Sequence, residues 1–408
     1  MAEEKGTVSS ARAGLIEGVM FFTYAFFAVN WIAGSTLTPQ IIKDFNLGSF
    51  TSATMISNAI TIAKIIGNLL AASILAKLLP KKAIGLGSLL IVLGSLVALL
   101  SRQYAVFVIG RFIMGFGGAL YVVYFSPVVL HFFAPEKMPT INALNSVAYN
   151  VGSIIALLIV SPVIKWLSTW RASMAFFAII SAILFVLWLF FGEDFDPNKG
   201  KTNVVQEKYT AKEALKDKFN WFYPLTYSGL LTFYLVLLTI FPISGTTVIN
   251  SKTLSTLIAV GGVVGTLLAI VLSKHYFKRL PVLRWCGLVM TLFGFLMFTT
   301  KSGVLAVIAA LGIGIFMFMP MTSLVLIPQE LPNMTPARLT TIFGIFWSFS
   351  YIIETILYFL IGKAIGPSGN YTLGLMISLV ASLTFFLGSF LLPETGHGKE
   401  REKDKGGE

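Results

Sequence analysis

Four ionisable side chains lie inside long apolar segments of a chain that otherwise keeps its charges in polar stretches. They are Glu17, Lys64, Arg111 and Glu354. A charged group at the centre of a membrane helix costs about 2.5–3.5 kcal/mol, so the residues that remain there face a partner helix or a water-filled path. Glu17 lies within a turn or two of the start of its segment, where we expect it to reach water. The other three are candidates for a binding or proton-transfer site.

Lys64 belongs to a polar stripe near the middle of the apolar segment at residues 50–75. Ser57, Thr61, Lys64 and Asn68 recur at i, i+4, i+7 and i+11, which places them on one face of a helix. Two interpretations remain open for the lysine. It either snorkels or hydrogen-bonds to another helix, or it is an anion-binding or gating charge, since it is too central to snorkel easily.

Arg111 is followed by glycines at i+4 and i+7, Gly115 and Gly118, which allow another backbone to approach closely. The planar guanidinium suits a carboxylate or a similar oxyanion. Binding of an anion and packing between helices are both consistent with this pattern.

An amide cluster occupies the segment at 140–163. Asn142, Asn145 and Tyr149 share one helical face, with Asn150 and Ser153 close by. The cluster predicts hydrogen bonding to a polar solute, and hydrogen bonding between helices is the alternative.

Glu354 carries the sharpest functional signal. Trp347, Tyr351, Glu354 and Tyr358 run i, i+4, i+7 and i+11 along one face. At 1.5 Å per residue, the carboxylate lies ~22 Å from the start of its segment near residue 339, well inside the apolar layer. We predict that Glu354 carries the coupling proton and that Tyr351 contacts the substrate; the alternative for Glu354 is a structural ion pair.

The composition identifies the class of protein that must position these residues. Hydrophobic residues make up 56% of the 408 positions and charged residues only 12%, against about 25% charged residues in soluble domains. Twelve apolar segments lie near 15–37, 50–75, 83–101, 105–130, 140–163, 172–191, 222–243, 253–273, 283–300, 304–327, 339–361 and 372–392. Because period-2 alternation is absent, the sequence predicts an all-α membrane protein with twelve transmembrane helices rather than a β-barrel.

A polar break divides the twelve segments into two sets of six. We therefore predict an N-terminal half at 1–191, a linker at 192–221, a C-terminal half at 222–392 and a charged tail at 393–408. With both termini in the cytoplasm, cytoplasmic segments hold 21 Lys and Arg residues and outer loops hold 7. This asymmetry favours cytoplasmic termini in a multi-pass protein of the cell membrane.

The two halves repeat each other. Residues 65–71 match residues 263–269 at an offset of 198, and Gly115 to Gly117 match Gly312 to Gly314 at an offset of 197. Tyr149 corresponds to Tyr351 at an offset of 202. Matches at nearly one offset, in register with the segment count, indicate duplication and two pseudo-symmetric six-helix bundles.

Several classes of site are not supported. Cys286 is the one cysteine, and the three histidines lie far apart in sequence, so no metal site is predicted. No phosphate-binding loop is visible. We therefore expect no cofactor, no metal, no ATP-driven pump and no enzyme. The formal charge of +12 indicates contact with anionic lipid rather than nucleic acid.

Two motifs stand near the ends of apolar segments: residues 39–45, Pro-Gln-Ile-Ile-Lys-Asp-Phe, after the first segment, and residues 110–118, Gly-Arg-Phe-Ile-Met-Gly-Phe-Gly-Gly, in the fourth. Both resemble motifs of the major facilitator superfamily. The family's loop signature between spans 2 and 3 is degraded, with Ser73 at its glycine and Lys77 at its aspartate. The resemblance covers nearly the whole chain and identifies no subfamily.

The resemblance implies a secondary active transporter that works by alternating access. It implies that spans 1, 4, 7 and 10 line a central cavity and that spans 2, 5, 8 and 11 form the interface between the halves. Inside the spans, two basic side chains, Lys64 and Arg111, outnumber the one deeply placed acid, Glu354. This excess of positive charge favours a substrate that is a small polar anion, organic or inorganic, and we expect it to move in symport with protons. We expect a monomer whose substrate contacts Lys64, Arg111 and the residues of the amide cluster, together with Tyr351.

Two alternatives remain. Aromatic cavity faces would suit a proton-driven exporter of amphiphilic compounds, although the exporter motif of span 5 is missing. A non-transporting receptor or scaffold could use the same fold, because fold does not determine function.

Overall fold

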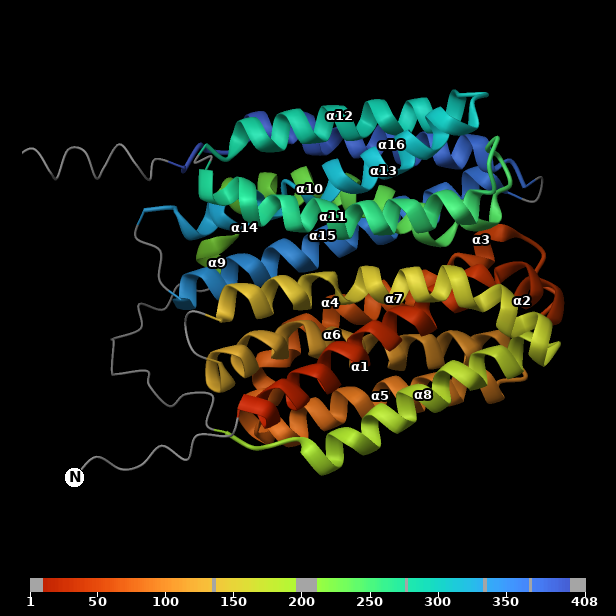
Figure 1. Cartoon of the computed structure of the whole chain (residues 1–408), viewed down its shortest axis with the longest axis horizontal. Coiled ribbons are helices and arrows are strands. Elements are labelled where there is room, and N and C mark those ends of the chain that lie inside the picture. The colour runs from red at the N-terminus through yellow and green to blue at the C-terminus, as the bar shows by residue number, and fades with distance from the viewer. Residues whose placement is uncertain are drawn as a thin grey trace, which may run out of the picture.

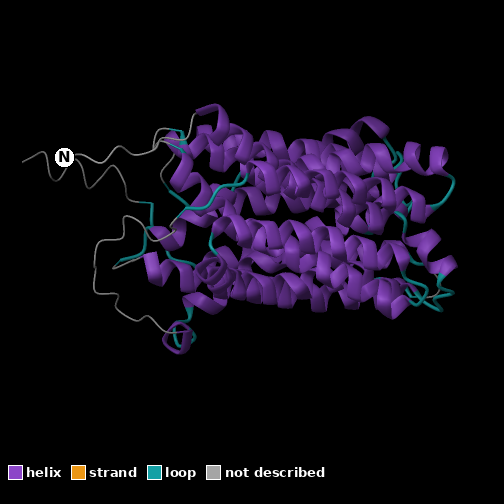
Figure 2. Cartoon of the chain, turned by 90° about the horizontal axis from the view of Figure 1, so that it is seen from below, coloured by secondary structure: helices purple, strands orange, loops and turns teal. Residues whose placement is uncertain are grey.

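The computed structural model describes residues 10–133, 137–195, 211–275, 278–332, 336–366 and 369–396. Helices and loops make up this part of the chain, and no strand occurs within it (Figure 2). Twelve helical segments of the described chain are long and apolar enough to cross a membrane, which confirms the predicted all-α fold with twelve transmembrane helices.

The first half of the chain contains six long helices and two short ones. The long helices are α1 (Ser10–Thr36), α4 (Met55–Leu78), α5 (Pro80–Leu100), α6 (Tyr104–Phe132), α7 (Met138–Leu167) and α8 (Trp170–Phe191). The short helices α2 (Thr38–Asp44) and α3 (Phe50–Ala53) lie between α1 and α4.

The second half repeats this arrangement with one interruption. Its helices are α10 (Phe219–Thr239), α11 (Ser251–His275), α12 (Leu280–Thr299), α13 (Gly303–Phe318), α14 (Met321–Gln329), α15 (Pro336–Ile365) and α16 (Tyr371–Gly388). Single turns α9 (Ala211–Ala214), η1 (Phe241–Ile243) and η2 (Ser389–Leu391) complete it. The tenth span, predicted at 304–327, is confirmed as Gly303–Pro328, and within it a turn at Pro320, whose nitrogen has no hydrogen for a helical bond, separates α13 from α14.

The two halves form two bundles that lie side by side (Figure 1). α1 to α8 make the lower bundle in that view, and α10 to α16 make the upper one. The start of α1, the end of α8 and the short helix α9 lie at one end of the bundles, which we call the terminal end. The opposite end, near α2 and α3, is called the far end.

Corresponding contacts recur in the two bundles. Gly67 of α4 packs against α6, and Gly265 of α11 packs against α13 in the same way. At the terminal end, Asp194 Oδ1 accepts the Lys81 backbone N–H at the start of α5 (2.9 Å), and Glu394 accepts the Arg279 backbone N–H at the start of α12 (2.7 Å). A carboxylate is stabilised at a helix N-terminus. The duplication seen in the sequence therefore extends to the caps of these helices.

Hydrogen bonds from α3 and α4 to α15 join the two bundles toward the far end. Thr51 Oγ1 donates to the Gly362 carbonyl oxygen (3.3 Å), and Asn58 Nδ2 donates to the Thr355 carbonyl oxygen (3.3 Å). The hydroxyls of Thr61 and Thr355 are 2.8 Å apart. These bonds close this interface on the far side of the molecular centre.

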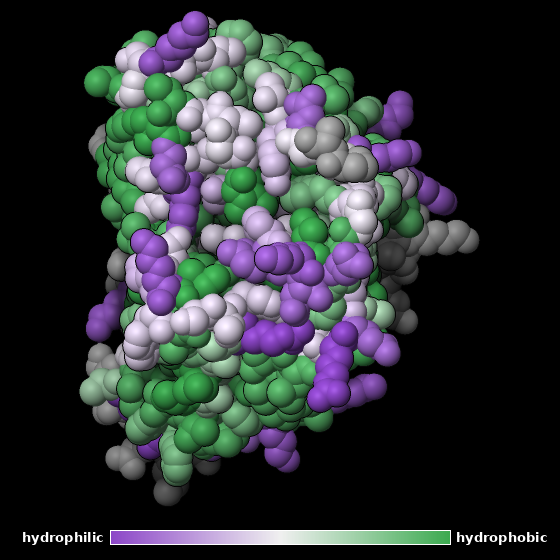
Figure 3. All heavy atoms as spheres, turned by 90° about the vertical axis from the view of Figure 1, so that its right-hand side faces the viewer, coloured by the Kyte–Doolittle hydropathy of each residue, from purple (hydrophilic) through white to green (hydrophobic). Residues whose placement is uncertain are grey.

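A second set of contacts joins α7 to α11. Lys252 Nζ donates to Ser161 Oγ at 2.5 Å, again toward the far end. Figure 3 views that end and shows polar side chains gathered over its middle, where the bundles meet. On the terminal side of the molecular centre, Ser146 of α7 is exposed. The structure is therefore closed toward the far end and more open toward the terminal end.

Candidate functional site

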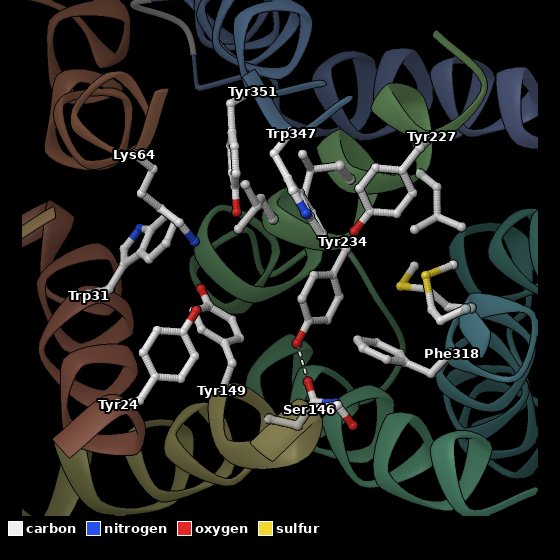
Figure 4. Close-up of a pocket in the computed structure, with 16 residues that line it drawn as sticks. Tyr24, Trp31, Lys64, Ser146, Tyr149, Tyr227, Tyr234, Phe318, Trp347 and Tyr351 are labelled. Carbon is white, nitrogen blue, oxygen red and sulfur yellow. Dashed lines mark hydrogen bonds between the residues drawn. The ribbon is translucent and has the colours of Figure 1, made fainter. Parts of the chain in front are cut away.

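A cavity of ≈ 170 Å³ lies between the two bundles (Figure 4). It is lined by Tyr24 and Trp31 of α1, Lys64 of α4, Ser146, Tyr149 and Asn150 of α7, Tyr227, Leu230, Leu231, Tyr234 and Leu235 of α10, Met317, Phe318 and Met321 of α13 and α14, and Trp347 and Tyr351 of α15. The family resemblance had implied that the fourth span, α6, lines the cavity, but none of the described side chains of α6 does so. Spans 2, 5 and 11 take part instead.

Lys64 is the one charged side chain among the residues that line this cavity. Its Nζ lies 5.2 Å from the centroid of the Trp31 ring and 4.8 Å from that of Tyr351, and the residue is only 4% exposed. Contact with aromatic faces stabilises a desolvated ammonium by about 2 kcal/mol. None of the ion pairs formed within the described chain includes Lys64. Trp31 and Tyr351 therefore form an aromatic cage around a buried amine, and its ammonium form would be stabilised by a bound anion.

Aromatic rings continue from this cage around the cavity. The Tyr149 ring lies 5.6 Å from Trp31 and 6.1 Å from Tyr234, centroid to centroid. Tyr234 donates a hydrogen bond to Asn150 Oδ1 and so links α10 to α7 across the two bundles. The Tyr149 hydroxyl is buried without a hydrogen-bond partner in the described structure. In Figure 4 this hydroxyl lies on the same side of the cavity as the Lys64 nitrogen.

The opposite side of the cavity holds its apolar residues, together with the ring of Tyr227. Phe318 lies across from Lys64 in Figure 4, and its ring contacts that of Tyr234 at 5.1 Å. The lining residues without a polar hydrogen-bonding group all come from the second bundle: Leu230, Leu231, Leu235, Met317, Phe318 and Met321. The cavity therefore has a cationic, hydroxyl-bearing pole and an apolar pole.

Glu354 lies beside the cavity but does not line it. The side chain is 1% exposed at the interface of α15 with α4, where Thr355 Oγ1 donates to Glu354 Oε2 at 3.4 Å. It is close enough to Lys64 for the two charges to interact, although they do not form a direct ion pair. The carboxyl group thus lies one turn from Tyr351, within the closed interface toward the far end.

Arg111 is buried behind the cavity wall. Its Nε, Nη1 and Nη2 donate to the carbonyl oxygens of Ile56, Asn30 and Trp31 at 2.9, 2.8 and 2.9 Å. The side chain is 0% exposed, so it joins α6 to α4 and α1 through backbone groups. Its contact with the Trp31 carbonyl helps to hold the helix whose indole contacts Lys64. We therefore leave Arg111 out of the proposed binding site and treat it as a positioning residue.

Asn145 and Glu17 lie apart from the cavity lining. Asn145 is 8% exposed, neither of its side-chain polar atoms has a hydrogen-bond partner in the described structure, and it faces Glu17 of α1. Glu17 is 3% exposed, so the expectation that it reaches water is wrong. α1 packs against α7, and Asn145 of α7 lies beside the Glu17 carboxyl group. The side chain of Asn142 lies outside the described residues.

The glycines after Arg111 have the predicted effect. A Cβ on Gly115 would meet the Ile60 backbone of α4, and a Cβ on Gly118 would meet the Phe27 ring of α1. The two helices that receive the guanidinium bonds are therefore the ones that these glycines admit.

The sequence matches the profile of the Major Facilitator Superfamily over residues 19–355. The chain belongs to this superfamily. Its family and fold are those of membrane transporters. An uncharacterised protein of Campylobacter jejuni is 29% identical over 239 residues, covering 59% of this chain and 73% of that protein. An uncharacterised protein of Mesomycoplasma hyopneumoniae is 25% identical over 232 residues. The matched region covers 52% of this chain and 48% of the Mesomycoplasma protein.

Solved structures of the same fold include a D-xylose–proton symporter, with a TM-score of 0.72 and 15% identity over 94% of this chain and 98% of that one. The xylose transporter XylE from E. coli in an inward open conformation gives a TM-score of 0.68 at 16% identity, over 96% and 99% of the two chains. These similarities establish the superfamily fold, with its twelve membrane spans in two bundles.

Of the predicted site residues, the structure brings Lys64, Tyr149 and Tyr351 together in the cavity. Sequence reasoning missed Tyr24 and Trp31 of α1, and Tyr227 and Tyr234 of α10. A signal was available, since both pairs are spaced seven residues apart and correspond to each other at an offset of 203. In a duplicated transporter, aromatic residues at matching positions of spans 1 and 7 indicate a shared cavity.

Proposed function

We propose that this protein is a proton-coupled symporter that moves a small anion by alternating access. The observation that carries the proposal is the single cavity cation, Lys64, caged by Trp31 and Tyr351 without a direct acidic partner. A buried cation is stabilised strongly by a bound anion because both lie in a low dielectric. The adjacent acid, Glu354, is the proposed proton carrier.

Charge balance between these two groups accounts for coupling. In the carrier without substrate, the Lys64 ammonium and the Glu354 carboxylate balance each other. When a monoanion binds Lys64, the Glu354 carboxylate loses this balance and must take up a proton before the α4–α15 interface can close around it. A carrier that has bound only the anion or only the proton holds a buried net charge, which costs several kcal/mol. Only the empty carrier and the carrier loaded with both ligands then reorient readily.

The proposed orientation places the terminal end and both termini in the cytoplasm, and the membrane is the cell membrane. Support comes from the 21 Lys and Arg residues of the predicted cytoplasmic segments against 7 in the outer loops. In this orientation the structure is closed to the outside, and the cavity is reached from the cytoplasm. The chain is proposed to act as a monomer, since one chain supplies the whole cavity.

Purified full-length protein in liposomes tests the proposal. Labelled organic and inorganic anions should accumulate when the interior is made alkaline. Uptake of a monoanion with one proton moves no net charge, so a membrane potential set with potassium and valinomycin should change the accumulation ratio little. Accumulation of a neutral sugar, independent of Lys64, would refute the proposal. Extrusion driven by protons moving inward would instead identify an exporter of amphiphilic compounds.

A further inference from the structure

The two poles of the cavity restrict the chemical structure of the substrate, in addition to the sign of its charge. Resting on the proposed anion transport, we infer that the substrate is a monocarboxylate with a compact apolar body, whose carboxylate faces Lys64 and whose body contacts the wall formed by Leu231, Met317, Phe318 and Met321. The polar contacts available at the cationic pole include the Lys64 ammonium and the unpartnered Tyr149 hydroxyl.

The number of cations limits the substrate to one negative charge. Lys64 is the only charged residue that lines the cavity in the described structure. The guanidinium of Arg111 is directed to three backbone carbonyls and is not available to a second carboxylate. A dicarboxylate would therefore leave one charged group against the apolar wall, at a large desolvation cost.

The apolar wall disfavours ligands that are polar throughout. The lining offers hydrogen bonds at several side chains, among them Ser146, Asn150 and Tyr227, but the oxygens of a sugar or an inorganic oxyanion that contact Leu231, Met317, Phe318 and Met321 find no hydrogen bond there. An apolar body gains from the same contact, since each buried methylene strengthens binding about fourfold, the equivalent of ~0.8 kcal/mol. Methionine adapts its shape to ligands, so the wall suits both linear and branched bodies.

The cavity volume sets the size of the body. An apolar protein cavity of about 150 Å³ holds one benzene molecule. The ≈ 170 Å³ measured here therefore accommodates about six to eight non-hydrogen atoms. Butanoate, pentanoate and hexanoate fall in this range, whereas acetate leaves the apolar wall without contact and decanoate exceeds the space.

A chain-length series on the full-length protein in lipid nanodiscs tests the inference. Affinities of acetate, butanoate, hexanoate, decanoate, succinate, phosphate, hexanamide and D-xylose are measured by calorimetry. We expect affinity to rise about fourfold per methylene from acetate to hexanoate and to fall for decanoate. Succinate, phosphate and D-xylose should bind at least tenfold more weakly than hexanoate.

Two variants separate the poles. Met321→Gln keeps the side-chain length but makes the wall polar, so hexanoate should lose about fourfold or more in affinity while acetate changes little. Met376→Gln is the matched control, because Met376 is also partly buried but lies on α16 outside this cavity. Lys64→Met should weaken acetate and hexanoate by the same factor and leave hexanamide unchanged.

The outcomes distinguish this inference from the proposed function. Binding of phosphate or acetate through Lys64 that equals binding of hexanoate would overturn the apolar-body inference and leave anion transport intact. Hexanamide binding as tightly as hexanoate, with no effect of Lys64→Met, would refute anion recognition itself. Tight binding of D-xylose would overturn both.

Discussion

Replacing Glu354 by glutamine should separate substrate exchange from proton-driven accumulation. Glutamine has the size and hydrogen-bonding capacity of a protonated glutamate, and Thr355 can still donate to its side-chain oxygen. With a monoanion bound at Lys64, the variant has the same net charge as the fully loaded carrier and should reorient. Without substrate, the variant keeps the Lys64 charge with no balancing carboxylate and should return slowly.

The expected accumulation ratio of the substrate follows from the number of carboxyl groups that carry a proton in each transport cycle. One carboxyl group next to the cavity cation gives one proton per anion, and one pH unit corresponds to 1.36 kcal/mol, or a tenfold ratio. A gradient of 1.5 pH units should therefore drive about 30-fold accumulation by the unaltered protein. In Glu354→Gln the ratio should fall to about one, while counterflow of labelled against unlabelled substrate continues.

Counterflow and pH-driven uptake are measured on one liposome preparation, beside a melting curve of the same protein. Glu193→Gln is the matched control, because Glu193 pairs with Arg12 at the terminal end, far from the cavity. Loss of both activities together with a lowered melting temperature would show that Glu354 only stabilises Lys64 as a structural charge. Undiminished accumulation in Glu354→Gln would refute its role as proton carrier.

Three further substitutions test the other buried charges. Lys64→Met should leave the protein inserted and stable but weaken substrate binding about 10- to 100-fold, the loss of one charge-assisted hydrogen bond; unchanged affinity in a thermal-shift titration would contradict anion binding there. Arg111→Lys should lower unfolding stability by about 2–4 kcal/mol and impair transport nearly as much as Arg111→Ala, because an ammonium cannot reproduce the fork that reaches three carbonyls. Glu17→Gln removes a buried carboxylate whose oxygens lack partners in the described structure, so stability in melting curves should hold or rise. Lost proton-driven accumulation in that variant would assign the coupling to Glu17 rather than Glu354.

The sequence predicted the spans and part of the cavity because both depend on local pattern. Twelve apolar segments are read directly from composition, and the polar stripe through Lys64 identifies the buried face of α4. The stripe through Trp347 and Tyr351 does the same for α15. Polar side chains that recur at helical spacing in a membrane helix face the interior of the helix bundle rather than the lipid.

Hydrogen-bond partners could not be predicted, because they depend on tertiary structure. The residues that receive the Arg111 guanidinium bonds lie 55 to 81 positions away in the chain. Nothing near Arg111 in sequence distinguishes a guanidinium that binds an anion from one that binds carbonyls. The same holds for Asn145, whose amide faces Glu17 of another helix instead of the cavity. The turn at Pro320 could not be predicted from the proline alone, because α7, α10 and α14 continue through Pro162, Pro224 and Pro328.

The duplication also explains why the proposed chemistry is confined to one side of the cavity. At the repeat offset of 198, the position that corresponds to Lys64 is Gly262, and at the offset of 202 the position that corresponds to Glu354 is Gly152. A Cβ on Gly152 would meet Ala25 of α1, and a Cβ on Gly262 would meet the Phe318 ring, so both sites are filled by neighbouring helices. Close packing thus occupies in one pair of spans the positions that carry charge in the other. The cavity therefore has a cationic pole next to α15 and an apolar patch around Phe318, and this asymmetry would give the proposed monoanion one preferred orientation.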